Sequence, residues 1–123
     1  MKIQESAENY LETILILHRR NGVVRSIDIA NELAFSKPSV SIAVRNLREN
    51  GYIQVDGHGY IELLSPGLEI AERIFERHQL LTNWLTALGV AEDIAAEDAC
   101  RIEHVISTES FEAIKRYTSK FSL

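Results

Sequence analysis

Apolar residues recur at helical spacing in the first part of the chain and predict three helices there. The first apolar face runs through residues 10–17. A short helix over residues 27–33 follows, for which Ser26 is the expected N-cap, and Ser36 is the expected N-cap of the next helix, which stops at Gly51. Two short helices separated by a tight turn predict a helix-turn-helix.

The pattern then changes to two short strands. Residues 52–55 and 60–63 alternate as strands do, and the glycine-bearing segment 56–59 between them favours a hairpin turn. A hairpin directly after the second helix of a helix-turn-helix is the wing of a winged helix. We therefore expect a winged helix-turn-helix DNA-binding domain over residues 1–64.

Helical spacing returns after the hairpin and predicts a second, helical domain over residues 65–123. Ser65 and Pro66 start a long helix that ends near Gly89, and two more helices are expected over 92–106 and 110–117. The apolar stripe of the long helix is wide, which fits either a buried central helix or coverage by a dimer partner. The predicted fold is mainly α.

Composition and charge narrow the function classes. With 123 residues, 46% hydrophobic and 25% charged, the chain suits a soluble globular protein without a membrane span. The N-terminus shows no signal peptide and Cys100 is the only cysteine, so a cytoplasmic location is expected. The net charge is −5, but residues 18–48 carry six basic and two acidic side chains, whereas residues 92–112 carry seven acids and one arginine.

Basic and small polar residues gather on and near the second helix of the helix-turn-helix. Most of them are expected to contact DNA phosphates, and only residues 36–39 to reach base edges. The candidate DNA contacts are Arg25, Ser26, Ser36, Lys37, Pro38, Ser39, Ser41, Arg45 and Arg48.

The segment from Cys100 to His104 holds the sharpest chemical signal. On a helix Cys100, Glu103 and His104 stand at i, i+3 and i+4, so a thiolate, a carboxylate and an imidazole share one face, as in half of a transition-metal site. The alternative is a small buried cysteine beside two exposed polar residues.

Three further polar residues carry weaker signals. His78 lies in the apolar stripe of the long helix, where a hydrogen-bonded core histidine is the ordinary interpretation. Asn9 and Glu12 share one face of the first helix, a pattern typical of a solvated surface.

Taken together, several segments resemble the diphtheria toxin repressor family of metal-dependent regulators, particularly its shorter manganese transport regulator branch. The resemblance covers nearly the whole chain and rests on the order and spacing of five segments. These are Glu8-Asn9-Tyr10-Leu11-Glu12, Ser36-Lys37-Pro38-Ser39-Val40-Ser41, Leu64-Ser65-Pro66-Gly67, Arg77-His78-Gln79-Leu80-Leu81 and Asp98-Ala99-Cys100-Arg101-Ile102-Glu103-His104.

The resemblance implies that Glu12, His78, Glu103 and His104 ligate an activating metal, with Asn9 and Cys100 at positions that also supply ligands. Asn9 stands where manganese-type members carry aspartate and iron-type members methionine. Cys100 replaces the glutamate of manganese-type members and resembles the iron type.

Other features separate the two branches as well. Thr82 and Ala96 occupy the places of a glutamate and a histidine in the ancillary site of iron-type members, so that site is not expected in its iron-type form. A chain ending at Leu123 also leaves no room for the SH3-like domain of that branch.

The function expected from these features is metal-dependent DNA binding by a homodimer that regulates transcription, as a repressor of metal uptake or homeostasis. Mn(II) or Fe(II) is the expected cofactor, with Co, Ni, Cd or Zn as surrogates, and neither a membrane nor a small organic substrate is expected as partner.

Two other functions compete with this interpretation. A metal-dependent hydrolase with Glu103 as general base lacks a phosphate loop, a nucleophile elbow and an HExxH helix, so no enzyme activity is expected. A metal-independent winged-helix regulator or interaction module stays open as the alternative.

Overall fold

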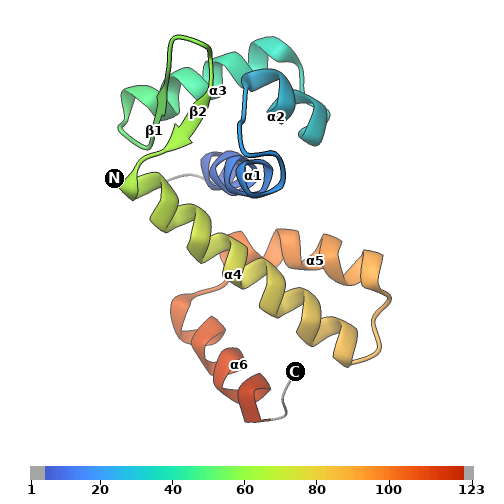
Figure 1. Ribbon diagram of the computed structural model, residues 1–123. Coiled ribbons are helices and arrows are strands. Elements are labelled where there is room, and N and C mark those ends of the chain that lie inside the picture. Colours follow the sequence, from blue (N-terminus) through green and yellow to red (C-terminus); the bar gives the residue numbers. More distant parts are fainter. Residues whose placement is uncertain (1–4, 121–123) are drawn as a thin grey trace. The chain divides into compact units, whose positions relative to one another are not determined.

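The computed structural model describes residues 5–120 and confirms the mainly helical fold with a small β-hairpin (Figure 1). The expectation about the first residues of the chain, 1–4, lies outside this range. Two compact units divide between Glu72 and Arg73, within α4. In chain order the elements are α1 (Glu5–Asn21), α2 (Ser26–Leu33), α3 (Lys37–Glu49), β1 (Ile53–Val55), β2 (Ile61–Leu63), α4 (Ser65–Ala87), α5 (Glu92–Val105) and α6 (Thr108–Lys120).

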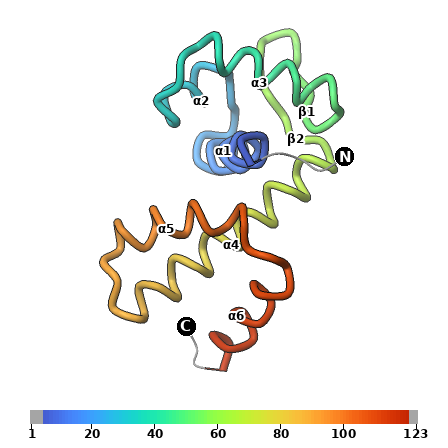
Figure 2. Tube along the Cα trace, turned by 180° about the vertical axis from the view of Figure 1, so that it is seen from behind, coloured from blue at the N-terminus to red at the C-terminus, as the bar shows by residue number. Residues whose placement is uncertain are grey.

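The core of the first unit forms where α2, α3 and the hairpin pack against α1 (Figure 2). Each of these elements contributes buried apolar side chains, which confirms the helix-turn-helix and its wing. Fully buried side chains in this core include Leu11 and Ile14 of α1, Ile29 of α2, Val40 of α3, and Ile53 and Ile61 of the strands.

The cap predicted for α2 is wrong, whereas that of α3 is confirmed. Arg25, not Ser26, is the N-cap of α2, because the carboxylate of Asp28 reaches back to accept a hydrogen bond from the Arg25 N–H at 2.8 Å. Ser36 caps α3 by accepting a hydrogen bond from the Ser39 N–H at 3.3 Å.

The wing is a short antiparallel hairpin in which Ile53 pairs with Leu63 and Val55 with Ile61. In its turn, the carboxylate of Asp56 accepts hydrogen bonds from the N–H groups of His58 and Tyr60 at 2.8 and 3.0 Å. These bonds, first that from Tyr60, lower the pKa of Asp56, because they stabilise the charged carboxylate.

The start of α4 is fitted closely to the residue before β1. The Leu64 N–H donates to the Tyr52 carbonyl at 3.0 Å, and a Cβ added at Gly67 would overlap that same carbonyl oxygen. Gly67 is therefore required for a close approach of two backbone segments.

The second unit consists of the rest of α4 with α5 and α6. Figure 2 shows α5 returning beside α4 after the turn at Gly89, whose φ of +103° suits glycine. Helix α6 begins two residues before the predicted Ser110 and continues past Tyr117. The buried apolar side chains of this unit are Ile74, Leu81, Ala95, Ala99 and Phe111. Within residues 5–120, no helix combines the length and apolarity needed to cross a bilayer.

Candidate functional site

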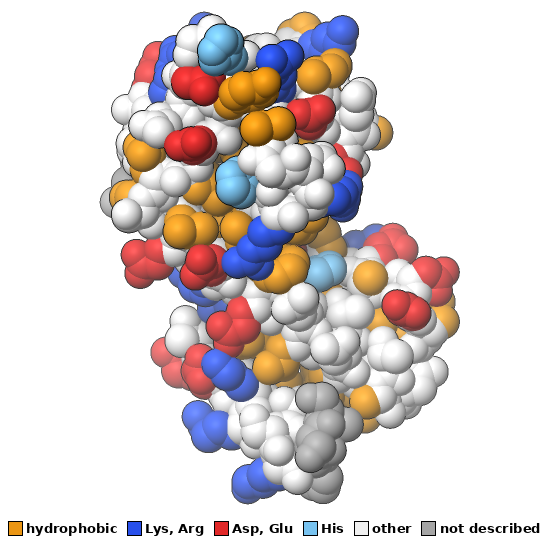
Figure 3. Space-filling view, in the orientation of Figure 1, with side chains coloured by type: hydrophobic (Ala, Val, Ile, Leu, Met, Phe, Trp, Pro, Cys, Tyr) orange, Lys and Arg blue, Asp and Glu red, His pale blue; other side chains and the backbone are white. Residues whose placement is uncertain are grey.

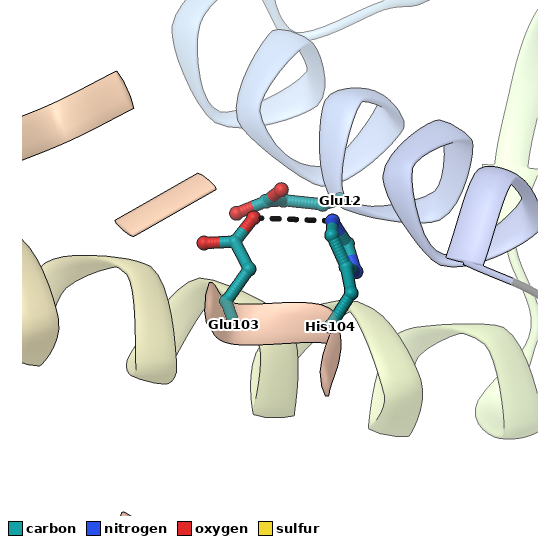
Figure 4. Close-up of side chains that lie close together, drawn as sticks. All are labelled: Glu12, Glu103 and His104. Carbon is teal, nitrogen blue, oxygen red and sulfur yellow. Dashed lines mark ion pairs between the residues drawn. The ribbon is translucent and has the colours of Figure 1, made fainter. Parts of the chain in front are cut away.

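Three polar side chains of the second unit gather around the end of α5. Glu103 is fully buried at 0% exposure, and its Oε2 lies 2.8 Å from Nδ1 of His78 on α4. Its other oxygen, Oε1, lies 3.4 Å from Nε2 of His104, whose side chain is 3% exposed (Figure 4). A buried carboxylate between two imidazoles is the arrangement that the metal interpretation predicts. The ordinary interpretation of His78 as a hydrogen-bonded core histidine fits the same contact with Glu103.

The donor chemistry of the cluster fits a divalent cation. The Oε1 atom of Glu103 is buried and accepts no hydrogen bond from the residues that the structure describes. Burial of such an oxygen is costly unless an opposite charge or a donor satisfies it. Carboxylate oxygen and imidazole nitrogen are ligands that suit Mn, Fe and Zn.

Arg77 holds the backbone that carries Glu103. Its buried guanidinium donates from Nη1 to the carbonyls of Glu103 and Ile106 at 3.1 and 2.9 Å. The same group donates from Nη2 to the Thr108 hydroxyl at 3.4 Å and lies 5.4 Å from the centre of the Phe111 ring. Arg77 therefore joins α4 to the end of α5 and the start of α6.

Sequence reasoning missed this positioning role of Arg77. The available signal was its place between the core residues Ile74 and Leu81, three and four residues away on the inward face of α4. An arginine at such a position requires carbonyl or carboxylate partners, because a charged group is rarely buried alone.

Cys100 differs from the other two residues predicted on its face of α5. Cys100 is exposed, whereas Glu103 is fully buried and the side chain of His104 is almost fully buried. The alternative of a buried cysteine beside two exposed polar residues is therefore wrong. The structure brings Glu103 and His104 together with His78 and leaves Cys100 toward the solvent side of α5.

Asn9 and Glu12 belong to α1 of the first unit. Glu12 is 5% exposed, so the solvated polar face expected as the ordinary interpretation does not describe it. The backbone carbonyl of Asn9 accepts a hydrogen bond from the Thr13 hydroxyl at 2.8 Å. Their part in metal binding stays a prediction.

The candidate DNA surface lies on α3 and the start of α2. The predicted contacts on α3 are all exposed, namely Lys37, Pro38, Ser39, Ser41, Arg45 and Arg48. A hollow of about 220 Å³ is lined by Ser26, Ile27, Lys37 and Ser41, so two hydroxyls and an ammonium border one depression. Arg25 is exposed beside the wing, with its guanidinium 4.6 Å above the ring of Tyr60.

Positive charge on this unit is local rather than general. Helix α3 carries three basic side chains and one acid, Glu49. On the face drawn in Figure 3, basic, acidic and hydrophobic side chains are intermixed, in keeping with the net charge of −5. The exposed side of α3 is thus a suitable surface for phosphate in a chain that is acidic overall.

A winged helix-turn-helix followed by a helical unit with a carboxylate and imidazole cluster defines a metal-dependent transcriptional regulator. Comparison with known families supports both halves of this description. The iron dependent repressor N-terminal DNA-binding domain matches residues 2–60, and the iron dependent repressor metal binding and dimerisation domain matches residues 65–122. The chain belongs to the iron-dependent repressor family, which confirms the resemblance found in its sequence.

Individual relatives point to the manganese branch of that family. The transcriptional regulator MntR of Escherichia coli O6:H1 is 34% identical over 117 residues, covering 95% of this chain and 76% of the relative. A solved structure of the manganese regulator SloR matches with a TM-score of 0.81 at 25% identity, over 97% of this chain. A manganese-dependent transcriptional repressor in complex with manganese matches with a TM-score of 0.83 at 26% identity, over 92% of this chain. The chain spans about half the length of these two solved chains, 55% and 52%.

Proposed function

We propose that this chain is a metal-activated transcriptional repressor of metal uptake or homeostasis, which binds operator DNA as a homodimer when it holds Mn(II) or Fe(II). The observation that carries the proposal is the buried Glu103 carboxylate between His78 and His104, inside the region that matches a metal-binding domain. The relatives are transcriptional regulators, which supports a role without catalysis. A cytoplasmic location is part of the proposal.

The proposed ligands come from three helices. His78 of α4 with Glu103 and His104 of α5 supply donors from the second unit, and Glu12 supplies a carboxylate from α1 of the first. This last assignment rests on the family resemblance. Asn9 and Cys100 are the proposed additional donors.

The ligand types bear on the choice of ion. Two carboxylates and two imidazoles suit Mn(II) and Fe(II), whereas the exposed thiol of Cys100, if ionised, favours softer ions. We propose that Co, Ni, Cd and Zn bind as surrogates, because the same nitrogen and oxygen donors accept them. The manganese in a related repressor structure favours Mn(II) as the first ion to test.

Coupling between the two units follows from ligands on both. A bound divalent ion supplies the positive charge that offsets the carboxylates of Glu12 and Glu103. In the absence of that charge the two carboxylates repel each other, and the orientation of α1 relative to the second unit is less restricted. Joint ligation therefore favours one arrangement of the two α3 helices of a dimer, the one whose spacing fits successive major grooves.

The proposed DNA contacts divide by chemistry. Arg25, Lys37, Arg45 and Arg48 contact phosphates, as do the hydroxyls near the hollow beside α2. The start of α3, from Ser36 to Ser39, lies in the major groove. Dimer spacing and DNA shape add specificity to these few base contacts.

DNA affinity measured at fixed salt, with chelator and then with Mn(II) or anaerobic Fe(II), tests the proposal. A coupling free energy of 1–3 kcal/mol, typical of such switches, corresponds to an increase of roughly 5- to 150-fold on adding metal. Glu103→Gln and Glu12→Ala should each reduce this increase and weaken metal binding measured by calorimetry. Glu97→Gln, an exposed carboxylate on the same α5, is the matched control. Equal DNA affinity with and without metal would exclude the sensor and favour a metal-independent regulator.

A further inference from the structure

The outward face of α3 carries an apolar side chain at its centre. Val40, Val44 and Leu47 turn inward and are 0%, 8% and 5% exposed. Ile42 is two residues from Val40, about 200° around the helix axis, and is 52% exposed. The side of α3 directed away from the core is therefore built around an isoleucine.

Neighbours on this face determine what Ile42 can recognise. Pro38 and Arg45 lie four residues before and three residues after it, so all three share one face of the helix. Pro38 and Ile42 have no side-chain hydrogen-bond donor or acceptor. Pro38 and Ile42 therefore form an apolar part of this face, which can contact methyl groups but cannot hydrogen-bond to base edges. Exposed polar side chains, Ser39 and Asn46, lie on the same face beside them.

Charge on the flanks favours DNA over an apolar protein partner. Lys37, Arg45 and Arg48 are exposed around Ile42, with Glu49 as the acid of the same helix. Basic residues are suited to phosphates, and one isoleucine beside one proline is too small an apolar patch for a protein interface. In the major groove of DNA, thymine alone among the four ordinary bases presents a methyl group.

We propose that Ile42, together with Pro38, contacts the C5-methyl group of a thymine in the major groove, so that a T·A pair at this place determines operator choice. This inference rests on the proposed DNA-binding function and adds to it a specificity residue. Ile42 contributes by covering the methyl group and excluding water from it, which adds affinity without a hydrogen bond.

The experiment uses the full chain loaded with Mn(II). Duplexes that the protein selects from a random pool define the bound sequence, and each thymine in it is then replaced singly by deoxyuridine. This replacement removes the methyl group and leaves every hydrogen-bonding atom in place. We expect the affinity of the wild-type chain to fall about fourfold at one thymine of each half-site, the effect of burying one methyl-sized group.

Variants at position 42 link that thymine to the side chain. In Ile42→Ala the loss of affinity caused by deoxyuridine at this thymine should become much smaller, because only the Pro38 contact remains. In Ile42→Val it should decrease less, and the losses at other thymines should be unchanged. Glu49→Gln, at an exposed position of α3 that is not among the proposed DNA contacts, should keep the wild-type profile.

Three outcomes would overturn the inference. The first is a wild-type chain whose affinity falls at no thymine when deoxyuridine replaces it. The second is an unchanged profile in both Ile42 variants, and the third is loss of the effect in Glu49→Gln as well. Failure of the wild-type chain to bind any duplex, with or without metal, would instead overturn the proposed function, and the inference with it.

Discussion

Replacing Arg77 with methionine should destabilise the second unit strongly. The guanidinium donates to two backbone carbonyls, at 3.1 and 2.9 Å, and a methionine of similar length fills the space without donating. Hydrogen bonds to a charged group contribute about 1.5–3 kcal/mol each. The substitution also removes the free-energy cost of burying the Arg77 charge, and this offsets part of that sum. We expect a loss of about 2–4 kcal/mol in the free energy of unfolding.

Urea unfolding of the metal-free chain at fixed concentration measures this loss. Trp84 is the sole tryptophan and lies on α4 in the second unit, so its fluorescence reports on the affected part. Arg101→Met is the matched control, since its pair with Glu97 is exposed at 74% and 67%. Such an exposed pair contributes about 0.5 kcal/mol or less. A loss of unfolding free energy below about 1 kcal/mol in Arg77→Met, with an unchanged m-value, would contradict the view that the Arg77 hydrogen bonds stabilise the second unit.

Three further predictions concern the first unit. Gly67→Ala should lower its free energy of unfolding by about 1–3 kcal/mol, because the new methyl group overlaps a backbone carbonyl, whereas Gly57→Ala should change it little; equal thermal midpoints by circular dichroism would contradict this. Asp56 should titrate below the ordinary aspartate pKa of about 3.9 in carboxyl NMR, and a midpoint at or above that value would refute the turn hydrogen bonds. Its stabilising effect on the wing is thus complete above the unfolded-state pKa and is lost as the pH falls through the lower folded-state pKa. Arg45→Ala should weaken binding to unrelated DNA sequences and reduce the salt slope by about one, and an unchanged slope would remove Arg45 from the phosphate contacts.

The elements predicted with least error are those whose signals are local. Apolar periodicity together with Ser36 is enough to place α3, because its cap and its inward face lie within a few residues of each other. The wing follows similarly from two short alternating runs around a glycine-bearing turn. Their ends differ from prediction by one residue, where pairing between strands, rather than composition, decides which residues join the ladder.

Errors occurred where two local signals competed. Ser26 resembles a cap, but the Asp28 side chain reaches the Arg25 N–H and moves the start of α2 one residue earlier. At α6, the Ser107 hydroxyl accepts a hydrogen bond from the Ser110 N–H, so the helix begins before the predicted residue. Spacing alone does not show which of two neighbouring polar side chains makes the capping bond.

The candidate site needed tertiary information for its remaining parts. The i, i+4 rule groups Cys100 with Glu103 and His104, but the packing of α5 against α4 decides that Glu103 is buried and Cys100 exposed. The contact of His78 with Glu103 spans 25 residues, and no pattern within either helix specifies it.

The hydrogen bonds from Arg77 to the carbonyls of Glu103 and Ile106 also bear on which ions the site would prefer. They fix the main chain at Glu103 to the helix that bears His78, so the gap between the carboxylate and the imidazole is defined by protein contacts alone. A rigid pair of donors accepts ions whose bond lengths fit that gap and strains against others, as small octahedral Mg²⁺ and larger Ca²⁺ illustrate in proteins. Loss of the Arg77 hydrogen bonds should therefore reduce the differences in binding affinity among cations more than it reduces the affinity for any one cation.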